Sequence, residues 1–209
     1  MKVMKQPLIL LLLFTFSQYA SAYSSEYDVI QIYSQDELNE LVNLNKHLQR
    51  VKSDDCQLVA DIKAHALKIK EPAYTYLWGD MLAWGVCVER DARLGMHYIE
   101  QAAKQGLLPA LEQLGRYYEK GILVETNKAR ALIYYREAAL QGFLNAQFNY
   151  VRMLMDGYGS PVDYEDAYRS LFLSIIDDKR LKQKTKNLLS QLAEKMPEHV
   201  VTRARKVAI

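Results

Sequence analysis

The chain has 209 residues, and its 27 basic and 25 acidic side chains give a formal net charge of +2. Only 9 Gly and 5 Pro interrupt a sequence rich in Leu, Ala and Tyr, which favours helices, and the length suits one domain with a sizeable core. Beyond the N-terminus, charged residues break every apolar stretch before it reaches the roughly 20 residues that span a bilayer, which excludes a membrane channel.

The first 22 residues have the pattern of a secretory signal peptide. Lys2 and Lys5 give a basic start, residues 8–16 are apolar, and Ala20-Ser21-Ala22 supplies the small residues that signal peptidase needs. The alternative is an uncleaved membrane anchor, but the apolar run is well short of a bilayer span. We therefore expect a soluble, exported protein that begins near residue 23.

Residues 23–71 precede the repeats described below. Residues 23–33 (YSSEYDVIQIY) are apolar and β-prone, and we expect either a disordered leader or a strand offered to another molecule. Residues 34–71 are expected to form an N-terminal cap of two helices. Ser34 starts a capping box before the first helix, ELNELVNLNKHLQRV, and Asp54 opens a second helix that Pro72 ends.

A 36-residue period organises residues 72–178, and it is typical of repeated pairs of helices. We expect three repeats, at about residues 73–106, 110–142 and 146–177. The recurring positions are Gly79 and Gly115; Gly85, Gly121 and Gly157; Gly106 and Gly142; Ala102-Ala103 and Ala138-Ala139; and Asp91, Asn127 and Asp163.

Each recurring residue type has a predicted structural role. Gly79 and Gly115 fall in mid-helix, where glycine costs about 1 kcal/mol relative to Ala, so their recurrence indicates close contact with a partner helix. The glycines at the phase of Gly85 are expected to end the first helix of each repeat. Asp91, Asn127 and Asp163 are expected to cap the second helix.

The repeat LGRYYEKGILVETNKARALIYYREAALQG, residues 114–142, resembles the Sel1-like repeat (SLR), a relative of the tetratricopeptide repeat (TPR). Repeat three departs from the pattern at Val151, Ser174-Ile175 and Asp178, as expected for a terminal repeat. The resemblance implies an all-α fold: a short right-handed α-solenoid of TPR-like helix-turn-helix repeats, with N-terminal capping helices.

Residues 179–209 form a basic C-terminal segment. This segment has 9 basic and 2 acidic side chains, whereas residues 23–178 have 16 basic and 23 acidic ones. We expect a helix over residues 179–195, broken by Pro197, followed by a tail. The segment could meet an anionic surface, although a solvated helix face is the simpler explanation.

The chain has two cysteines, Cys56 and Cys87. In an exported protein, two cysteines predict one disulfide, which would join the cap to the loop of the first repeat. Closing a loop of about 31 residues stabilises the fold by roughly 3.5 kcal/mol in the chain-entropy model. One alternative is two free buried thiols. A metal site is the weaker alternative, because no cluster of Cys or His has the spacing of metal ligands.

No enzyme motif is present in the sequence. The four histidines (His47, His65, His97 and His199) are scattered, and none lies in a zinc-binding pattern. Asp61 and His65 are four residues apart and could bind a metal, although an ion pair is the simpler reading. The sequence also has no serine nucleophile motif, no phosphate-binding glycine loop and no nucleic-acid motif. We therefore expect no catalysis, and no cofactor, small-molecule substrate or nucleic acid as a ligand. The expected function is that of a solenoid that binds other proteins.

A closer resemblance covers most of the chain. The strings IYSQDELNELVNLNKHLQRVKSDDCQLV (32–59), AYTYLWGDMLAWGVCVERD (73–91), ALEQLGRYYEKGILV (110–124) and YGSPVDYEDAYRSL (158–171) resemble a family of periplasmic proteins of the sodium-driven polar flagellar motor. LNKHLQRV, DMLAWGVCVE and YGSPVDYEDAYR are not features of the SLR consensus. The repeats alone leave an alternative, a generic periplasmic SLR scaffold in envelope assembly or stress.

The flagellar resemblance implies location and partners. Proteins of that family join MotY in the T ring, a periplasmic disc of the flagellar basal body that docks the PomA/PomB stator. This chain would then be a structural adaptor, peripheral to the membrane, with a MotY-like ring protein and the periplasmic part of a PomB-like stator as partners. We expect the leader and the cap helices to face the ring partner, and either the repeat groove or the basic C-terminal segment to meet the stator. The candidate contact residues are Tyr27, Ile30, Ile32 and Tyr33 in the leader, and Lys182, Lys184, Lys186, Arg203, Arg205 and Lys206 in the basic segment.

Overall fold

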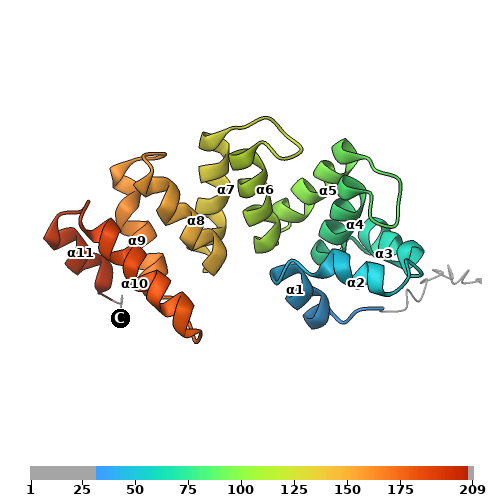
Figure 1. Cartoon of the computed structure of the whole chain (residues 1–209), viewed down its shortest axis with the longest axis horizontal. Helices are drawn as coiled ribbons and strands as arrows, with labels where there is room; N and C mark the ends of the chain where they lie inside the picture. Colours follow the sequence, from blue (N-terminus) through green and yellow to red (C-terminus); the bar gives the residue numbers. More distant parts are fainter. Residues whose placement is uncertain (1–31, 207–209) are drawn as a thin grey trace, which may run out of the picture.

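The computed structural model describes residues 32–206, and within that range the chain forms helices and turns but no strand. The predicted signal peptide and most of the leader, including Tyr27 and Ile30, lie outside the described residues. The helices follow an arch, with α1 and α2 at one end and α10 and α11 at the other (Figure 1). None of the described helices has both the length and the apolar character needed to cross a membrane.

The cap consists of short helices, and the repeats consist of longer ones. The cap contains α1 (Gln35–Asn43), α2 (His47–Ser53), α3 (Val59–Ala64) and a π-helical turn, η1 (His65–Ile69). The repeats contain α4 (Pro72–Trp84), α5 (Ala92–Lys104), α6 (Leu108–Lys120), α7 (Lys128–Leu140), α8 (Leu144–Met155), a 3-10 turn, η2 (Pro161–Asp163), and α9 (Tyr164–Phe172). They are followed by α10 (Lys179–Ala193) and α11 (Glu198–Arg205).

The recurring residues form the helix ends as predicted in the first two repeats. Gly85 and Gly121 end α4 and α6 with φ of 66° and 70°, a left-handed conformation that glycine adopts without steric cost. The side chains of Asp91 and Asn127 cap α5 and α7, each accepting a hydrogen bond of 2.9 Å from a backbone N–H three residues on. These caps fix where the second helix of each pair begins.

The third repeat departs from this pattern, and the predicted capping role of Asp163 is wrong. The Asp163 side chain makes no capping bond to α9; its carboxylate instead accepts a hydrogen bond from the N–H of Ser160, at 3.3 Å. Ser160 and Pro161 start a 3-10 turn three residues earlier, because proline is pre-organised for the first helical position.

The predicted path of the cap is also wrong in two places. The first expected helix is broken between α1 and α2, where Asn45 has a φ of 55°. Asp54 does not open a helix but ends α2, and Asp55 and Cys56 follow with φ of 52° and 60°. This left-handed turn carries Cys56 to Cys87, to which a disulfide joins it, with 5.4 Å between the Cα atoms.

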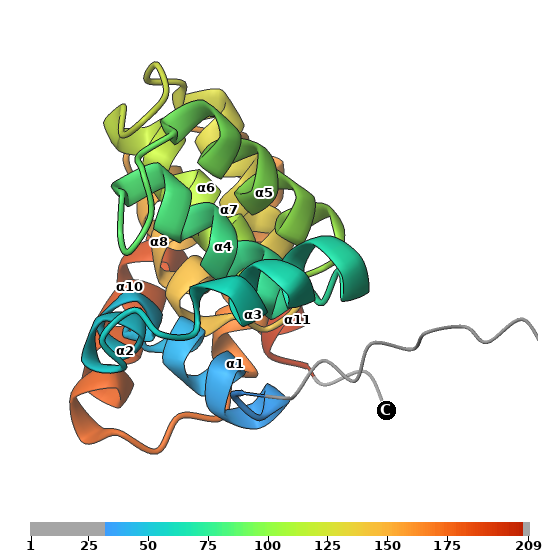
Figure 2. The same ribbon diagram turned by 90° about the vertical axis from the view of Figure 1, so that its right-hand side faces the viewer.

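The cap lies against the first helix of the first repeat. All the cap elements (α1, α2, α3 and η1) contact α4, as the view from that end shows (Figure 2). Eleven of the 13 residues of α4 are buried, because the cap covers one side of the helix and α5 the other. The core then continues through the repeats on buried alanines and on the rings of Tyr117, Tyr135 and Tyr150.

Candidate partner-binding groove

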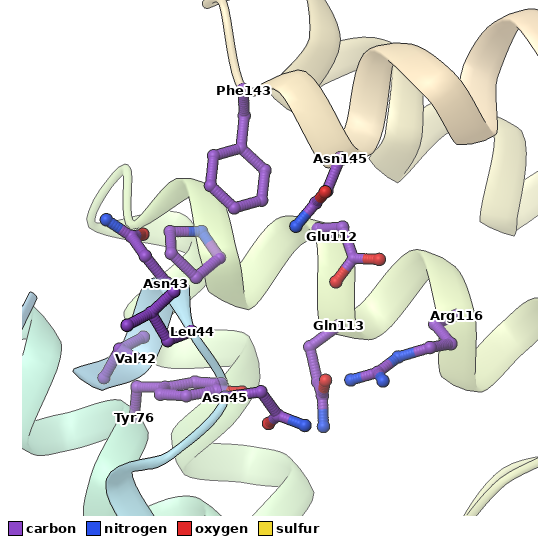
Figure 3. A pocket seen from close by; sticks show the side chains of 11 residues that line it. Val42, Asn43, Leu44, Asn45, Tyr76, Glu112, Gln113, Arg116, Phe143 and Asn145 are labelled. Atoms are coloured by element: carbon purple, nitrogen blue, oxygen red, sulfur yellow. The ribbon is translucent and has the colours of Figure 1, made fainter. Parts of the chain in front are cut away.

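Two adjoining cavities lie between the cap and the repeats. One, of about 170 Å³, lies among the α1–α2 turn, α4, α6 and the start of α8 (Figure 3). The other, of about 340 Å³, lies among α2, α4 and α6. Asn45, Gln113 and Arg116 line both, so they form one continuous groove, which we call the cap groove. Its other lining residues are Val42, Asn43, Leu44, Leu48, Tyr76, Asp80, Trp84, Pro109, Glu112, Tyr117, Ile122, Phe143 and Asn145.

The repeat geometry places the side chains of the groove. On α4, Tyr76, Asp80 and Trp84 follow one another at intervals of four residues, which brings them to one face of the helix. On α6, Glu112 and Arg116 occupy the positions 36 residues after Tyr76 and Asp80. Two neighbouring helices therefore present matching rows of side chains to the same space.

A buried polar network forms the floor of the cap groove. His47 Nε2 lies 2.7 Å from the Asp80 carboxylate, and the Tyr117 hydroxyl donates to the other oxygen of Asp80 at 3.4 Å. The Tyr117 oxygen accepts hydrogen bonds from Gln113 at 2.5 Å and from the Trp84 indole at 2.9 Å. Burial and the neighbouring Asp80 raise the pKa of Tyr117. Because three of these four bonds join different elements, linking α2 to α4 and α4 to α6, the network holds the groove in one shape.

The walls of the groove combine apolar and amide side chains. Leu44 is 53% exposed and Trp84 44% exposed, although each has a large apolar side chain. In Figure 3, the side chains of Asn45, Gln113 and Arg116 are directed toward the same part of the groove. Exposed aromatic and aliphatic side chains beside polar donors and acceptors are typical of surfaces that bind other proteins.

Two charged residues of α6 line the groove. Burial raises the pKa of Glu112, and its carboxylate accepts one hydrogen bond from Asn149, at 3.1 Å. Arg116 lies one helical turn further on, and its Nε is buried without a hydrogen-bond partner among the described residues. The groove therefore has both an acidic and a basic group, and the basic group is unpaired.

Of the leader residues expected to contact the ring partner, the structure describes Ile32 and Tyr33. Both pack against the protein's own core. Tyr33 is 1% exposed: its hydroxyl donates to the Asp54 carboxylate at 2.6 Å, and its N–H donates to the Tyr74 hydroxyl at 3.1 Å. Ile32 is half-buried against the core. The prediction that Tyr33 faces a partner is therefore corrected, because its ring is buried and its polar groups are bonded to Asp54 in the cap and to Tyr74 on α4.

The basic residues expected to contact the stator fall into two groups. On α10, Lys182 and Lys186 are exposed. Lys184, also on α10, lies with its ammonium 4.1 Å from the centroid of the Phe148 ring. The tail arginines, by contrast, hold α11 on α9.

The contacts of these arginines explain why they do not project freely. Arg203 pairs with Glu165, with a hydrogen bond of 2.8 Å from its Nε, and Arg205 Nε donates to the Tyr168 hydroxyl at 2.8 Å. Lys206, which follows α11, is exposed. Arg203 and Arg205 are exposed as well, so the exposed basic surface covers α10 and α11, but the two arginines are already engaged by Glu165 and Tyr168.

The cap groove itself was not predicted from the sequence. The 36-residue period could have shown that Tyr76 and Glu112 face the same side, but not that the α1–α2 turn lies across them. Within residues 32–206, no group of three or more His, Cys, Asp or Glu side chains could hold a metal ion. His65 lies 3.4 Å from Glu71 rather than in a metal site with Asp61.

Comparisons with known proteins agree with this architecture. A family model described as Sel1 repeat matches residues 72–107, 108–143 and 144–169. A sodium-type polar flagellar protein MotX from Vibrio parahaemolyticus (serotype O3:K6, strain RIMD 2210633) is 48% identical over 177 residues, which are 85% of this chain and 84% of that protein. The match thus extends well beyond the repeats.

A solved structure shows the same fold, and a second one is similar to a lower degree. A Sel1 repeat protein from Oxalobacter formigenes superposes with a TM-score of 0.50 and 23% identity, over 73% of this chain and 56% of that chain. The protective antigen c5321 of uropathogenic Escherichia coli, which displays an SLR fold, gives a TM-score of 0.49 and 18% identity, over 83% of this chain and 41% of that one. With the repeat matches and the helices described above, the predicted all-α SLR fold is confirmed.

Proposed function

The chain belongs to the MotX family of sodium-type polar flagellar proteins and carries Sel1 repeats, and from that premise we propose that it is a periplasmic structural adaptor of the flagellar motor. The observation that carries the proposal is the length of the match, 85% of the chain, because repeats alone occupy residues 72–169. In this role the protein binds other proteins and performs no catalysis.

The finer part of the proposal concerns the partners. The protein joins a MotY-like protein in the T ring at the basal body, and it docks the periplasmic part of a PomB-like subunit of the PomA/PomB stator. Two structural features support a load-bearing adaptor. A continuous core runs from the cap through the repeats, and the disulfide fastens the cap to the first repeat. Both resist the local unfolding to which the ends of a repeat array are prone.

Clean deletion of the gene tests the proposal. We expect cells that assemble full-length filaments which do not rotate, with density missing from the T ring in tomograms, and rotation restored by the gene on a plasmid. Normal swimming after deletion would overturn the motor role. Normal swimming combined with sensitivity to envelope stress would instead favour a generic periplasmic SLR scaffold, the function that the repeats alone would suit.

A further inference from the structure

Arg116 is the least satisfied charged group of the cap groove. Among residues 32–206, its guanidinium makes no hydrogen bond or ion pair, and its Nε is covered by protein. A guanidinium has five N–H donors in a planar fork, and buried polar groups are nearly always bonded. An arginine that lines a groove and has no partner within the protein can bind an anionic group of another molecule.

The next repeat shows what Arg116 lacks. Arg152 occupies the same position 36 residues later, and its guanidinium binds both oxygens of the Glu119 carboxylate, at 2.7 and 2.8 Å. Counting back 36 residues from Glu119 gives Ala83, so the first repeat has no carboxylate at the equivalent place. Repeat two therefore supplies a carboxylate for Arg152, whereas repeat one supplies none for Arg116.

Two acidic residues, Asp80 and Glu112, lie near Arg116 in the repeat pattern, and both already make other hydrogen bonds. Asp80, 36 residues before Arg116, lies 1% exposed against His47 at 2.7 Å and also accepts from Tyr117. Glu112, one turn before Arg116, accepts a hydrogen bond from Asn149 and forms no ion pair. The positive charge of Arg116 is therefore not neutralised by a direct contact in the described part of the chain.

We propose that the cap groove binds an extended segment of a partner protein, and that Arg116 holds an acidic side chain of that segment in a two-pronged ion pair. This inference rests on the proposed adaptor function and gives one partner contact its chemistry. Carboxylate and guanidinium geometries match, and such charge-assisted pairs are stronger than neutral hydrogen bonds.

The rest of the groove fits a peptide better than a small anion. The exposed amide side chains of Asn45 and Asn145 line it and can donate to and accept from an extended main chain. The exposed Leu44 and Trp84 also line the groove and offer apolar contacts that a small anion bound to Arg116 would leave unused. Glu112, beside Arg116, disfavours a second acidic residue at that place, so the segment should carry one acidic residue among apolar ones.

A random library tests the inference without assuming which motor protein supplies the segment. Dodecapeptides displayed on phage are selected on the purified full chain, with counter-selection on the Arg116→Gln variant. The best peptide is then synthesised together with its amide twin, in which Asp or Glu becomes Asn or Gln, and both affinities are measured by fluorescence anisotropy. Arg93→Gln, which removes an exposed guanidinium on α5 outside the groove, is the matched control.

We expect the selected peptides to share one acidic residue with apolar neighbours. The amide twin should bind roughly 10- to 100-fold more weakly to the wild-type chain, and the acidic peptide should lose a similar factor on Arg116→Gln but not on Arg93→Gln. Failure to enrich acidic peptides, or equal binding of the two twins, would overturn the proposal. The twin comparison uses only the wild-type chain, so it holds even if Arg116→Gln is poorly folded.

The outcomes also separate this inference from the adaptor function. If the twins bind equally while the deletion strain assembles filaments that do not rotate, the groove chemistry is wrong and the motor role stands. If the deletion strain swims normally while the acidic peptide depends on Arg116, the groove chemistry stands and the motor role is wrong.

Addition of a synthetic peptide of residues 23–31, which contains Glu26 and Asp28, checks whether the chain's own leader is the occupant. Its binding at the affinity of the selected peptides would also overturn the proposal of a partner protein.

Discussion

At the scale of single residues, two glutamates of α6 show how their surroundings decide what a charge does. Burial alone would raise the pKa of Glu119, but hydrogen bonds from Tyr135 and Arg152 outweigh it and lower the pKa below its ordinary value. Glu112 has a raised pKa because burial outweighs the nearby positive charges of Arg116 and Lys120. The charge of Glu119 therefore stabilises the fold, whereas the charge of Glu112 costs free energy.

Glutamine substitutions should therefore have opposite effects. Glu119→Gln should lower the free energy of unfolding at pH 7 by about 1–3 kcal/mol, because it removes the closer of the two carboxylates that Arg152 binds and leaves only that of Asp156, at 3.3 Å. Glu112→Gln should leave that free energy unchanged or higher, because it removes a buried charge and keeps the acceptor for Asn149. Urea denaturation of the two variants beside the wild-type chain measures both.

The pH dependence of the free energy of unfolding tests whether the charges of Glu119 and Glu112 cause these effects. A lowered folded-state pKa gives stability that is present above the ordinary value of 4.5 and lost as the pH falls, so the deficit of Glu119→Gln should shrink below pH 4.5. A raised pKa makes the folded state bind its proton more tightly, so Glu112 should cost stability as the pH rises through 4.5. A deficit of Glu119→Gln that is unchanged between pH 7 and pH 3 would contradict this account.

At the scale of helices, close contact between α4 and α5 depends on glycine. A Cβ on Gly79 would lie 2.9 Å from the backbone oxygen of Gly95, and a Cβ on Gly95 would lie 2.5 Å from the backbone nitrogen of Ala83. A Cβ on Gly115 would instead lie 2.7 Å from the ring of Tyr135, on α7. The close contacts predicted for Gly79 and Gly115 are thus confirmed, and that of Gly95 is added by the structure.

We expect both Gly95→Ala and Gly115→Ala to destabilise the protein, by roughly 1–3 kcal/mol, with the larger loss at Gly95. At Gly95 the obstacle is backbone, which cannot move without separating the helices, whereas the Tyr135 ring can shift. Helix propensity alone would give the opposite sign, since alanine is favoured over glycine by about 1 kcal/mol in a helix. Thermal unfolding followed by circular dichroism measures the order, and a stabilised Gly95→Ala would refute the packing explanation.

The disulfide joins two elements that the chain separates by 31 residues. It ties the turn after α2 to the loop after α4, next to the cap that forms one wall of the groove. Replacing both cysteines with alanine should lower the free energy of unfolding by roughly 3.5 kcal/mol, since the unfolded chain gains the entropy of an open loop. Reductant should destabilise the wild-type chain and leave the double variant unaffected. Equal stability of the two proteins without reductant would contradict a stabilising bond.

The helix-scale features also show what a sequence can and cannot reveal. The 36-residue period revealed the repeats, the caps at Asp91 and Asn127 and the tight helix contacts, because each depends on residues close along the chain. The path of the cap depends on left-handed residues such as Asn45 and Cys56, a conformation that non-glycine residues rarely adopt without tertiary contacts. The cap groove could not be predicted for the same reason, since its wall is the turn at Asn45.

At the scale of the whole molecule, charge is unevenly distributed along the arch. Residues 179–209 have 9 basic and 2 acidic side chains, and α10 lies at the end opposite the cap (Figure 1). The pairing of Arg203 with Glu165 uses part of this charge to hold the last helix. The lysines of α10 point to a different use, because charged groups exposed on one side of a protein steer and orient partners of opposite charge.

Charge reversal on α10 tests whether this end recruits the stator. Lys182→Glu with Lys186→Glu should reduce swimming speed and the number of fluorescent stator foci, because it replaces two attractive charges with two repulsive ones while leaving the contact of Lys184 with Phe148 in place. Lys52→Glu with Lys104→Glu changes the net charge by the same amount at exposed sites elsewhere and should leave both measurements unchanged. Because salt screens exposed charges, the difference in swimming speed between the α10 variant and the wild type should become smaller as the ionic strength rises. Equal swimming and equal foci in the two strains would place the stator contact away from α10, and the cap groove would then be the first surface to test for it.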